Sequence, residues 1–232
     1  MGLCPLPNTP LFQLTAKAQT MGINVEEVVH RATGHRIGRI AWQSIYQPAV
    51  RMVNRYRVGR VFLAGDAAHV HPPAGGQGLN TGVQDAYNLG WKLAHVMRGG
   101  PESLLDTYES ERLPVAAAVL GLSKHLYQKR STKRGALTDQ LGLHYRGSSL
   151  SSGHPLGDLH PGDRMPDVPL ADGSRLFEHM RGSHATDFAT TEGPRILIRP
   201  DGYIAHIGEE QLRGYAGEPT ETVTGSVVRT EA

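Results

Sequence analysis

The sequence predicts an α/β fold of mixed α+β character, and three patterns carry this prediction. An apolar run at 59–65, "GRVFLAG", is typical of a buried strand that follows a turn at Gly59. A long amphipathic pattern at 79–97 follows it and predicts a helix. Further along, "RILIRPDGYIAHI" places two apolar runs around Pro-Asp-Gly, which predicts a β-hairpin at 195–207.

Composition and charge narrow the classes of function. The 232 residues are 39% hydrophobic and 20% charged, which is typical of a soluble globular protein with one large or two ordinary domains. Lys and Arg number 24 against 22 acidic residues, without a block of five like charges, so no nucleic-acid partner is expected. No apolar run approaches the roughly 18 residues of a membrane span, and no signal peptide is evident. We therefore expect a cytoplasmic protein without a membrane partner.

Three elements are predicted before residue 59. Residues 11–18, "LFQLTAKA", alternate in part and indicate a strand. In "NVEEVVHRATG", Asn24 is expected to cap a short helix that has acidic residues in its first turn and ends at Gly34. "RIAWQSIYQP" has β-branched and aromatic residues and predicts a further strand that ends at Pro48.

The helix predicted over 79–97 ends at the Gly-Gly-Pro sequence 99–101. Its charged residues Asp85 and Lys92 are expected at the surface or in pairs on the helix. Its apolar or small residues are spaced 4, 3, 4, 3 and 4 and form one continuous helical face: Leu79, Val83, Ala86, Gly90, Leu93 and Met97.

A second helix is predicted to begin at Ser103, with Asp106 as its capping-box partner. Pro114 should kink this helix or split it in two. Beyond it, residues 146–166 are rich in Gly, Ser, Pro and Asp with little periodicity, which indicates a linker before a small C-terminal domain.

The segment "GDAAHVHPPAGGQGLN" combines the features of a ligand site. The predicted strand ends at Gly65 and Asp66, so it delivers a carboxylate to the sheet edge where α/β proteins bind ligands. Such a carboxylate accepts hydrogen bonds, for example from polyol hydroxyls. Prolines stiffen the loop at 72–73, and the glycines of 75–78 let a flat ligand touch the backbone. The helix start near Gly78 directs unpaired N–H groups and a positive dipole at the same place, which suits a phosphate or an anionic ring system.

Other interpretations of this segment are less favoured. A P-loop lacks its Lys-Ser/Thr here, and a dinucleotide-binding GxGxxG pattern is absent. Asp66, His69 and His71 could form a metal site, but a third neutral ligand is not visible. A glycine-rich turn that serves only to pack helix on strand is a further alternative, at a large cost in backbone entropy.

The stretch "GRVFLAGDAAHVHPPAGGQGLNTGVQDAYNLGWKLA" closely resembles the GD motif and following helix of class A FAD-dependent monooxygenases, the aromatic hydroxylases of the phenol and polyketide type. The resemblance continues through "LLDTYESERLPVA" to "PGDRMPD" and "RPDGYIAHIG", which are similar to the thioredoxin-like C-terminal domain of many such enzymes. It implies a partial FAD-binding and substrate-domain fold followed by a small thioredoxin-like α/β domain. The implied domains are 1–58 from the substrate-binding sheet, 59–145 from the FAD-binding domain, a linker at 146–166, and 167–232 as the thioredoxin-like domain. Cys4 is the only cysteine, so scaffolding or dimer contact is expected of that last domain rather than disulfide chemistry.

The resemblance also implies the cofactor and its contacts. Asp66 falls on the family position that binds the ribityl chain of FAD, the loop backbone of 75–78 lies beside the isoalloxazine ring, and Pro73 lies on the reactive side of the flavin. The helix start at Leu79 and Asn80 faces the edge of the flavin that becomes negative on reduction. The implied cofactor-binding residues are Gly65, Asp66, Pro73, Gly75, Gly76, Gln77, Gly78, Leu79 and Asn80, with no catalytic side chain and no metal ligand.

The implied function is FAD-dependent hydroxylation of a small aromatic substrate, with NADPH or NADH as reductant and O2 as oxidant. The family's first GxGxxG unit, which grips the ADP half of FAD, does not occur in this sequence. We therefore expect weak or no FAD binding by this chain alone, and a homodimer or a chain that supplies the N-terminal half as its protein partner. The alternatives are a non-catalytic fragment that acts as an interaction or dimerisation module and, less favoured, a metal-dependent hydrolase.

Overall fold

A computed structural model describes residues 2–16, 24–45, 47, 49–129, 135, 138–191, 193–209 and 220–227. The chain divides into two compact units, residues 1–47 and residues 48–232, and each is described by itself. None of the helices in the described part of the chain has the length and apolar character that crossing a membrane requires.

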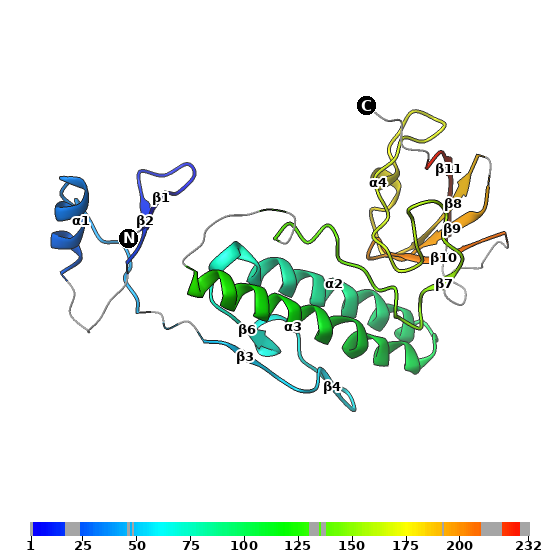
Figure 1. The fold of residues 1–232 in the computed structure, drawn as a ribbon, viewed down its shortest axis with the longest axis horizontal. Helices are drawn as coiled ribbons and strands as arrows, with labels where there is room; N and C mark the ends of the chain where they lie inside the picture. The colour runs from blue at the N-terminus through cyan, green and yellow to red at the C-terminus, as the bar shows by residue number, and fades with distance from the viewer. Residues whose placement is uncertain are drawn as a thin grey trace. The chain divides into compact units, whose positions relative to one another are not determined.

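The first unit contains a hairpin and one helix (Figure 1). Strands β1 (Gly2–Pro5) and β2 (Phe12–Thr15) pair antiparallel, and β2 accounts for the described part of the strand predicted at 11–18. Helix α1 (Val25–Thr33) confirms the predicted helix. Asn24 caps it by accepting a hydrogen bond from the Glu27 N–H, and Gly34 ends it in the left-handed conformation that glycine adopts without strain.

The strand predicted before Pro48 is wrong for the residues that the structure describes. Residues 39–45 and 47 form no strand, while Tyr46 and Pro48 lie outside the described residues. Trp42 of this segment is 81% exposed. Strand propensity needs a neighbouring strand to complete the hydrogen bonds of the backbone, and the β1–β2 hairpin offers this segment none.

The second unit begins with very short strands. Strand β3 (Arg51–Met52) pairs with β6 (His69–Val70), and β4 (Arg57–Val58) pairs with β5 (Val61–Phe62). The turn predicted at Gly59 is confirmed, but the buried strand predicted after it is not: β5 covers only Val61–Phe62 and pairs with β4 alone. Gly59 has a φ of 58°, which folds the run back as a tight turn and leaves Val61 exposed. Gly65 and Asp66 lie in a 3₁₀ turn, η1 (Gly65–Ala67), and not at the end of a long strand.

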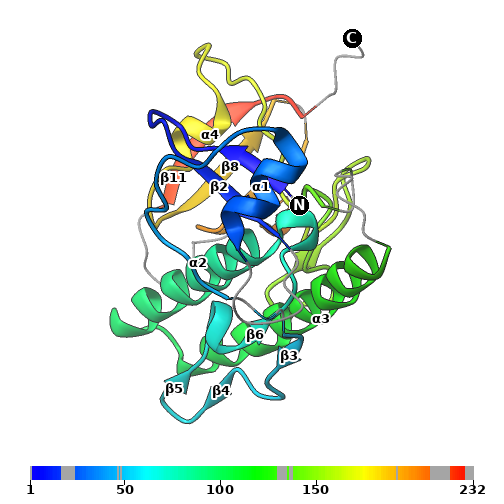
Figure 2. The ribbon, with the colours of Figure 1, turned by 90° about the vertical axis from the view of Figure 1, so that its left-hand side faces the viewer.

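Two long helices form the centre of this unit and run side by side (Figure 2). Helix α2 (Gly78–Met97) confirms the predicted helix, and a second 3₁₀ turn, η2 (Ala74–Gly76), precedes it. The turn η3 (Glu102–Leu105) leads into α3 (Asp106–Gln128), which continues through Pro114 as one helix, so the expected split does not occur. A small apolar core between the helices and the preceding turns consists of Tyr56, Ala68, Leu89, Tyr108 and Ala116.

The burial of α2 differs from the simplest expectation. Leu79, Val83 and Met97 of the predicted apolar face are 80%, 56% and 86% exposed. Asp85 and Lys92, which we expected at the surface or in pairs on the helix, are completely buried against α3. The apolar periodicity identified one side of the helix correctly, but in this chain it is the polar side that packs inward.

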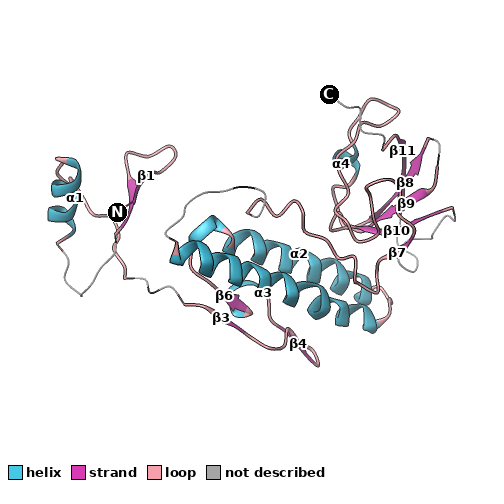
Figure 3. Cartoon of the chain, viewed as in Figure 1, coloured by secondary structure: helices cyan, strands magenta, loops and turns pink. Residues whose placement is uncertain are grey.

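A five-stranded mixed sheet forms the C-terminal part (Figure 3). Strands β8 (Ala185–Thr190), β9 (Arg195–Ile198) and β10 (Ile204–Gly208) are antiparallel, so the hairpin predicted at 195–207 is confirmed. Strands β11 (Thr220–Gly225) and β7 (Ser152–Gly153) add in parallel at the two edges, beside β8 and β10. A one-turn helix, α4 (Leu176–His179), lies beside this sheet. Its core consists of Met165, Leu170, Leu176, Phe188, Ile196, Ile198, Ile204, Ile207 and Val223.

Candidate functional site

A cleft of about 700 Å³ lies between the η1 turn, the proline-glycine loop and the first turns of α2. Six of the nine residues that the sequence singled out line it: Gly65, Asp66, Pro73, Gly76, Gly78 and Leu79. Ala64, His71, Gly82, Val83 and Ala86 complete its wall. The topology thus brings the 3₁₀ turn with Asp66 and the beginning of α2 to one open cavity, although they are separated in sequence by a loop.

The η1 turn rests directly on the backbone of α2. A Cβ atom on Gly82 would lie 3.3 Å from the Cα atom of Gly65, which is tighter than most side-chain contacts. Gly65 also has a φ of 57°, a conformation that favours glycine. These two glycines let the turn approach the helix closely, so the exposed carboxylate of Asp66 is held beside the cleft.

A buried carboxylate, Asp85, fixes this turn from beneath. Its Oδ2 accepts hydrogen bonds from the backbone N–H of Gly65 at 3.1 Å and from Nε2 of His69 at 2.7 Å. Its Oδ1 accepts a hydrogen bond from Nε of Arg112 at 2.7 Å. Burial alone would raise the pKa of Asp85, but the bond from His69 and the charge of Arg112 outweigh burial and hold this pKa below its ordinary value. The ionised Asp85 therefore ties the η1 turn, the β6 strand and α3 together.

The three predicted residues that do not line the cleft have other surroundings. Gly75 has a φ of 81°, and a Cβ atom there would lie 3.1 Å from the side chain of Leu126. Gln77 is buried, and its Nε2 donates to the carbonyl oxygens of Gly75 and Thr138, both at 2.8 Å. Asn80 is exposed on the first turn of α2. Gln77 thus anchors the glycine loop, which keeps the cleft open.

The beginning of α2 is open toward the cleft. Gln77 occupies the N-cap position, but no side chain caps the helix by a hydrogen bond in the structure as described. The first N–H groups of a helix have no partner in the preceding turn, and they carry the positive end of the helix dipole. Gly78 and Leu79 of this first turn line the cavity, so its amide groups can stabilise an anionic or electron-rich edge of a ligand.

The two histidines of the loop do not form a metal site. Their rings are stacked with centroids 6.4 Å apart, His69 is bonded to Asp85, and His71 Nδ1 lies 3.0 Å from the carbonyl oxygen of Pro72. Among the described residues, no group of three or more His, Cys, Asp or Glu side chains could hold a metal ion. Since Asp85 engages His69, the Asp66–His69–His71 set has no support in the geometry.

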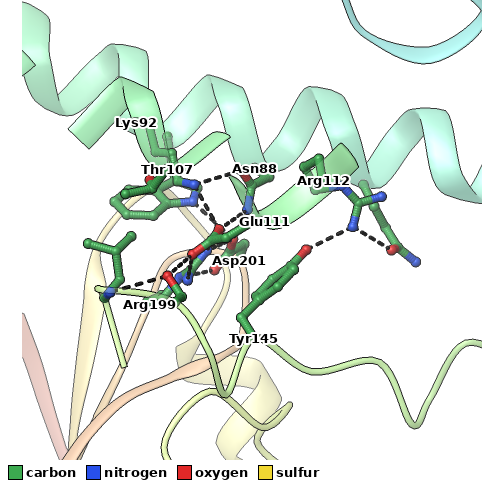
Figure 4. Close-up of polar contacts among 12 residues, drawn as sticks. Asn88, Lys92, Thr107, Glu111, Arg112, Tyr145, Arg199 and Asp201 are labelled. Atoms are coloured by element: carbon green, nitrogen blue, oxygen red, sulfur yellow. Dashed lines mark hydrogen bonds and ion pairs between the residues drawn. The ribbon is translucent and has the colours of Figure 1, made fainter. Parts of the chain in front are cut away.

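A second buried polar cluster joins the two helices to the C-terminal sheet (Figure 4). The carboxylate of Glu111 accepts two hydrogen bonds from Arg199, at 2.7 and 2.8 Å, and one from Nζ of Lys92 at 2.7 Å. Arg199 also binds Asp201 at 2.7 Å, and Asn88 donates to both Glu111 and Asp201. We call these five residues, Asn88, Lys92, Glu111, Arg199 and Asp201, the charge cluster.

The surroundings favour the charged form of Glu111 more than that of Lys92. Burial alone would raise the pKa of Glu111, but Arg199 and then Lys92 lower it to about 2. Burial lowers the pKa of Lys92 to about 8, since the attraction of Glu111 is partly offset by repulsion from Arg199. The ion pair of Glu111 with Arg199 is therefore the main interaction of the cluster, and the ion pair of Glu111 with Lys92 is the weaker one.

Sequence reasoning missed these contacts, because it expected Asp85 at the surface or in a pair on the helix and gave no polar role to Glu111 or Arg112. One signal was present. The polar residues Thr81, Asp85, Asn88 and Lys92 are spaced 4, 3 and 4, which is the same helical period as the apolar face. A polar face with that period, followed by a second helix with Glu111 and Arg112, is consistent with two helices that pair through buried charges.

The chain is similar in sequence to known flavin-dependent proteins. Residues 18–123 match a protein family described as an FAD binding domain. A flavin-dependent monooxygenase of Mycobacteroides abscessus is 44% identical over 88% of this chain and 51% of its own length. A rifampicin monooxygenase of Streptomyces venezuelae is 39% identical over 78% of this chain and 46% of its own length. The chain therefore spans about half the length of these curated relatives.

A solved structure agrees as well. The ternary complex of aklavinone-11 hydroxylase with FAD and aklavinone superposes with a TM-score of 0.60 and 29% identity, over 74% of this chain and 44% of the other. The mixed helical and C-terminal sheet arrangement is thus shared with an enzyme whose structure contains FAD.

Proposed function

Because the chain belongs to the family of class A FAD-dependent aromatic hydroxylases, we propose that its cleft holds the flavin ring and ribityl chain of FAD in an aromatic monooxygenase. The observation that carries this proposal is one cavity lined by an exposed aspartate, bare glycine backbone and an uncapped helix start. Bound FAD supplies the redox chemistry, in which a nicotinamide cofactor provides the electrons and O2 provides the oxygen atom. The described residues supply the binding and orientation.

The shape and chemistry of the cleft fit a flavin. The carboxylate of Asp66 is exposed and lines the cleft, so it can accept hydrogen bonds from ribityl hydroxyls. Gly76, Gly78 and Gly82 present backbone to the cavity, so a flat ring system can lie against them. The amide groups at the start of α2 line the cleft and would stabilise the negative charge that a bound flavin gains on reduction, which would favour its reduced state.

His71 is a further residue of the same wall. Its Nδ1 donates a hydrogen bond to Pro72 O, which can only accept. The ring lies behind Gly78, where a Cβ atom would meet Nε2 and Cε1 at 3.7 Å, so His71 supports the glycine wall of the cleft.

The proposal divides the chain by role. Residues 59–145 supply one side of the flavin site, residues 1–58 belong to the substrate-binding sheet, and residues 167–232 form a thioredoxin-like domain after the connection at 146–166. The substrate is a small aromatic or polyketide-like ring, as the names of the relatives suggest for those proteins. The exposed side of α2, with Leu79, Val83 and Met97, receives the portion of the FAD-binding domain that lies in the other half of the relatives.

Titration with three flavins tests the site. The lining residues of the cleft reach a ring and a ribityl chain but not the ADP half of FAD. We therefore expect this chain to bind riboflavin, FMN and FAD weakly, with affinities within about threefold of one another, or about 0.6 kcal/mol. Asp66→Ala should weaken riboflavin binding by about tenfold, since a hydrogen bond to a charged group contributes about 1.5–3 kcal/mol. Quenching of flavin fluorescence measures both.

Asp158→Ala is the matched control, because Asp158 is an exposed aspartate outside the cleft. It should leave riboflavin binding unchanged. If millimolar riboflavin shows no spectral change with the unmodified chain, or if Asp66→Ala binds as the unmodified chain does, the site is not a flavin site. A colourless protein that ignores all three flavins supports the alternative of a non-catalytic interaction module.

A further inference from the structure

Buried polar contacts connect the cleft to the C-terminal sheet. The N–H of Gly65 donates to Asp85, and Arg112 donates to the other oxygen of the same carboxylate. Nη1 of Arg112 then donates to the hydroxyl of Tyr145 at 2.7 Å. The side chains of Asp85, Arg112 and Tyr145 are all at least 95% buried, so water does not replace any of these bonds. Figure 4 shows Tyr145 between Arg112 and the charge cluster.

The ring and backbone of Tyr145 are held by the C-terminal part, while only its hydroxyl contacts helix α3 through Arg112. Its ring lies 4.3 Å from that of Tyr203, measured between centroids, and the guanidinium of Arg199 lies 5.1 Å from the centre of the same ring. The backbone N–H of Tyr145 donates to Gly162 O, and the N–H of Gly162 donates to Ile204 O, both at 2.7 Å. The position of the Tyr145 hydroxyl therefore follows the hairpin of β9 and β10.

Arg112 transmits this position because its guanidinium is planar and its bonds have fixed directions. Its Nε donates to the carboxylate of Asp85 and its Nη1 to the hydroxyl of Tyr145. Its Nη2 donates to Thr81 O at 3.2 Å. Without the Tyr145 hydroxyl, Nη1 of Arg112 keeps only its longer hydrogen bond, to Oε1 of Gln84 at 3.3 Å, and the guanidinium turns toward that acceptor. A turned guanidinium shifts the carboxylate of Asp85, whose second oxygen holds the N–H of Gly65.

We propose that Tyr145 is a positioning residue for the Gly65-Asp66 turn, which acts through Arg112 and Asp85 and makes the cleft depend on the docked C-terminal sheet. This assigns a role to a domain that has no cysteine for disulfide chemistry. The effect on Gly65 stands on the contacts alone. Its consequence for flavin binding rests on the proposed function.

The test is Tyr145→Phe, which removes one hydroxyl and keeps the ring between Tyr203 and Arg199. In the unmodified chain without any flavin, amide hydrogen exchange at Gly65 should be protected, and Tyr145→Phe should accelerate it by about tenfold, the effect of weakening one charge-assisted hydrogen bond by about 1.4 kcal/mol. Exchange at Ile198 and Ile204 in the C-terminal hairpin should stay within about twofold, which separates a local effect from general destabilisation. Riboflavin affinity should fall by about threefold to tenfold.

Tyr87→Phe is the matched control. The Tyr87 hydroxyl also joins α2 to the C-terminal part, by donating to Gly182 O at 3.0 Å, but it does not touch Arg112 or Asp85. It should leave Gly65 exchange and riboflavin affinity unchanged. Unchanged Gly65 exchange in Tyr145→Phe, or an equal change in Tyr87→Phe, overturns the proposal. If the unmodified chain binds no riboflavin, the flavin assignment fails, and the exchange of Gly65 still decides whether Tyr145 positions the turn.

Discussion

Helix α2 carries two faces with the same helical period and opposite chemistry. The face toward the rest of the chain is mainly polar. Its buried polar residues are Thr81, Asp85, Asn88, Lys92 and His95, and the apolar Leu89 and Trp91 are buried beside them. The face toward the outside is apolar or small and consists of Leu79, Val83, Ala86, Gly90 and Met97. In an ordinary surface helix this arrangement is reversed.

The difference between the two faces determines which kind of surface each of them can pack against. A buried charge is costly unless a partner meets it, so the inward face of α2 packs well only against a surface with matching charges. Helix α3 is such a surface, because its neighbouring residues Glu111 and Arg112 meet Lys92 and Asp85 respectively. The outward face carries no buried charge, so it does not require a partner surface with matching charges. It is suited to cover an apolar surface, and the proposed flavin cleft opens at its first turn, beside Leu79.

The largest expected effect comes from removing the centre of the charge cluster. Glu111→Gln leaves the buried cations Arg199 and Lys92 without their shared carboxylate, and this should lower the free energy of unfolding by about 3–5 kcal/mol. Urea unfolding followed by circular dichroism measures the loss. Lys92→Met is the matched control. Glu111 keeps Arg199 in that variant, so the expected loss is below about 1.5 kcal/mol. Equal losses in the two variants would show that Arg199 is not the main partner of Glu111.

The same cluster predicts an acid-sensitive contribution. The pKa of Glu111 is about 2 in the folded chain against an ordinary value of 4.5, so the unfolded chain takes up this proton first as the pH falls. Its stabilisation is complete above about pH 4.5 and is lost between about pH 4.5 and 2, with a size of roughly 3 kcal/mol. Unfolding measured across this range should show that loss in the unmodified chain, and the step should be absent in Glu111→Gln. An identical pH profile in both proteins assigns the acid sensitivity to other carboxylates.

The sequence predicts some secondary-structure elements of this chain better than others. Features with a local cause were predicted well: Asn24 and Gly34 bound α1, and Pro-Asp-Gly turns the C-terminal hairpin. Features that depend on a distant partner were not. The run at 59–65 has the composition of a buried strand and the turn at Gly59 was predicted, but among the described residues only the two-residue strand β4 pairs with it.

The candidate site shows the same limit. The glycines and Asp66 could be singled out because their chemistry is visible in one short segment. Asp85 lies 19 residues after Asp66 and Arg112 lies on another helix, so their contacts with the turn appear only once the chain is folded. Periodicity also identifies two sides of a helix without deciding which one is buried, because that depends on what the neighbouring helix offers.

An intermediate effect, on flavin binding more than on stability, is expected from a change at Gly82, where α2 packs against the η1 turn. Gly82→Ala adds a methyl group 3.3 Å from Gly65 Cα, so the turn has to move by a few tenths of an ångström. Alanine stabilises a helix by about 1 kcal/mol relative to glycine, and this offsets the local strain. The free energy of unfolding should therefore change by less than about 1 kcal/mol. Riboflavin affinity should nevertheless fall, because Gly65 and Asp66 are displaced. Gly90→Ala is the control, since a Cβ atom there meets nothing within 4 Å, and it should leave the affinity unchanged.

The smallest expected effect is on the outward face, and it tests whether that face is open. Leu79 and Met97 are 80% and 86% exposed, so Leu79→Gln with Met97→Gln should change the free energy of unfolding by less than about 0.5 kcal/mol. Sedimentation at several protein concentrations provides the second measurement. If the unmodified chain forms a dimer that the double variant does not, a second copy covers this face and the loss of stability will depend on concentration. If both remain monomeric and equally stable, the face is free to receive the remainder of an FAD-binding domain. A loss above about 2 kcal/mol in a monomer would mean that the helix packs through its apolar side after all, and the contrast between the two faces of α2 would not hold.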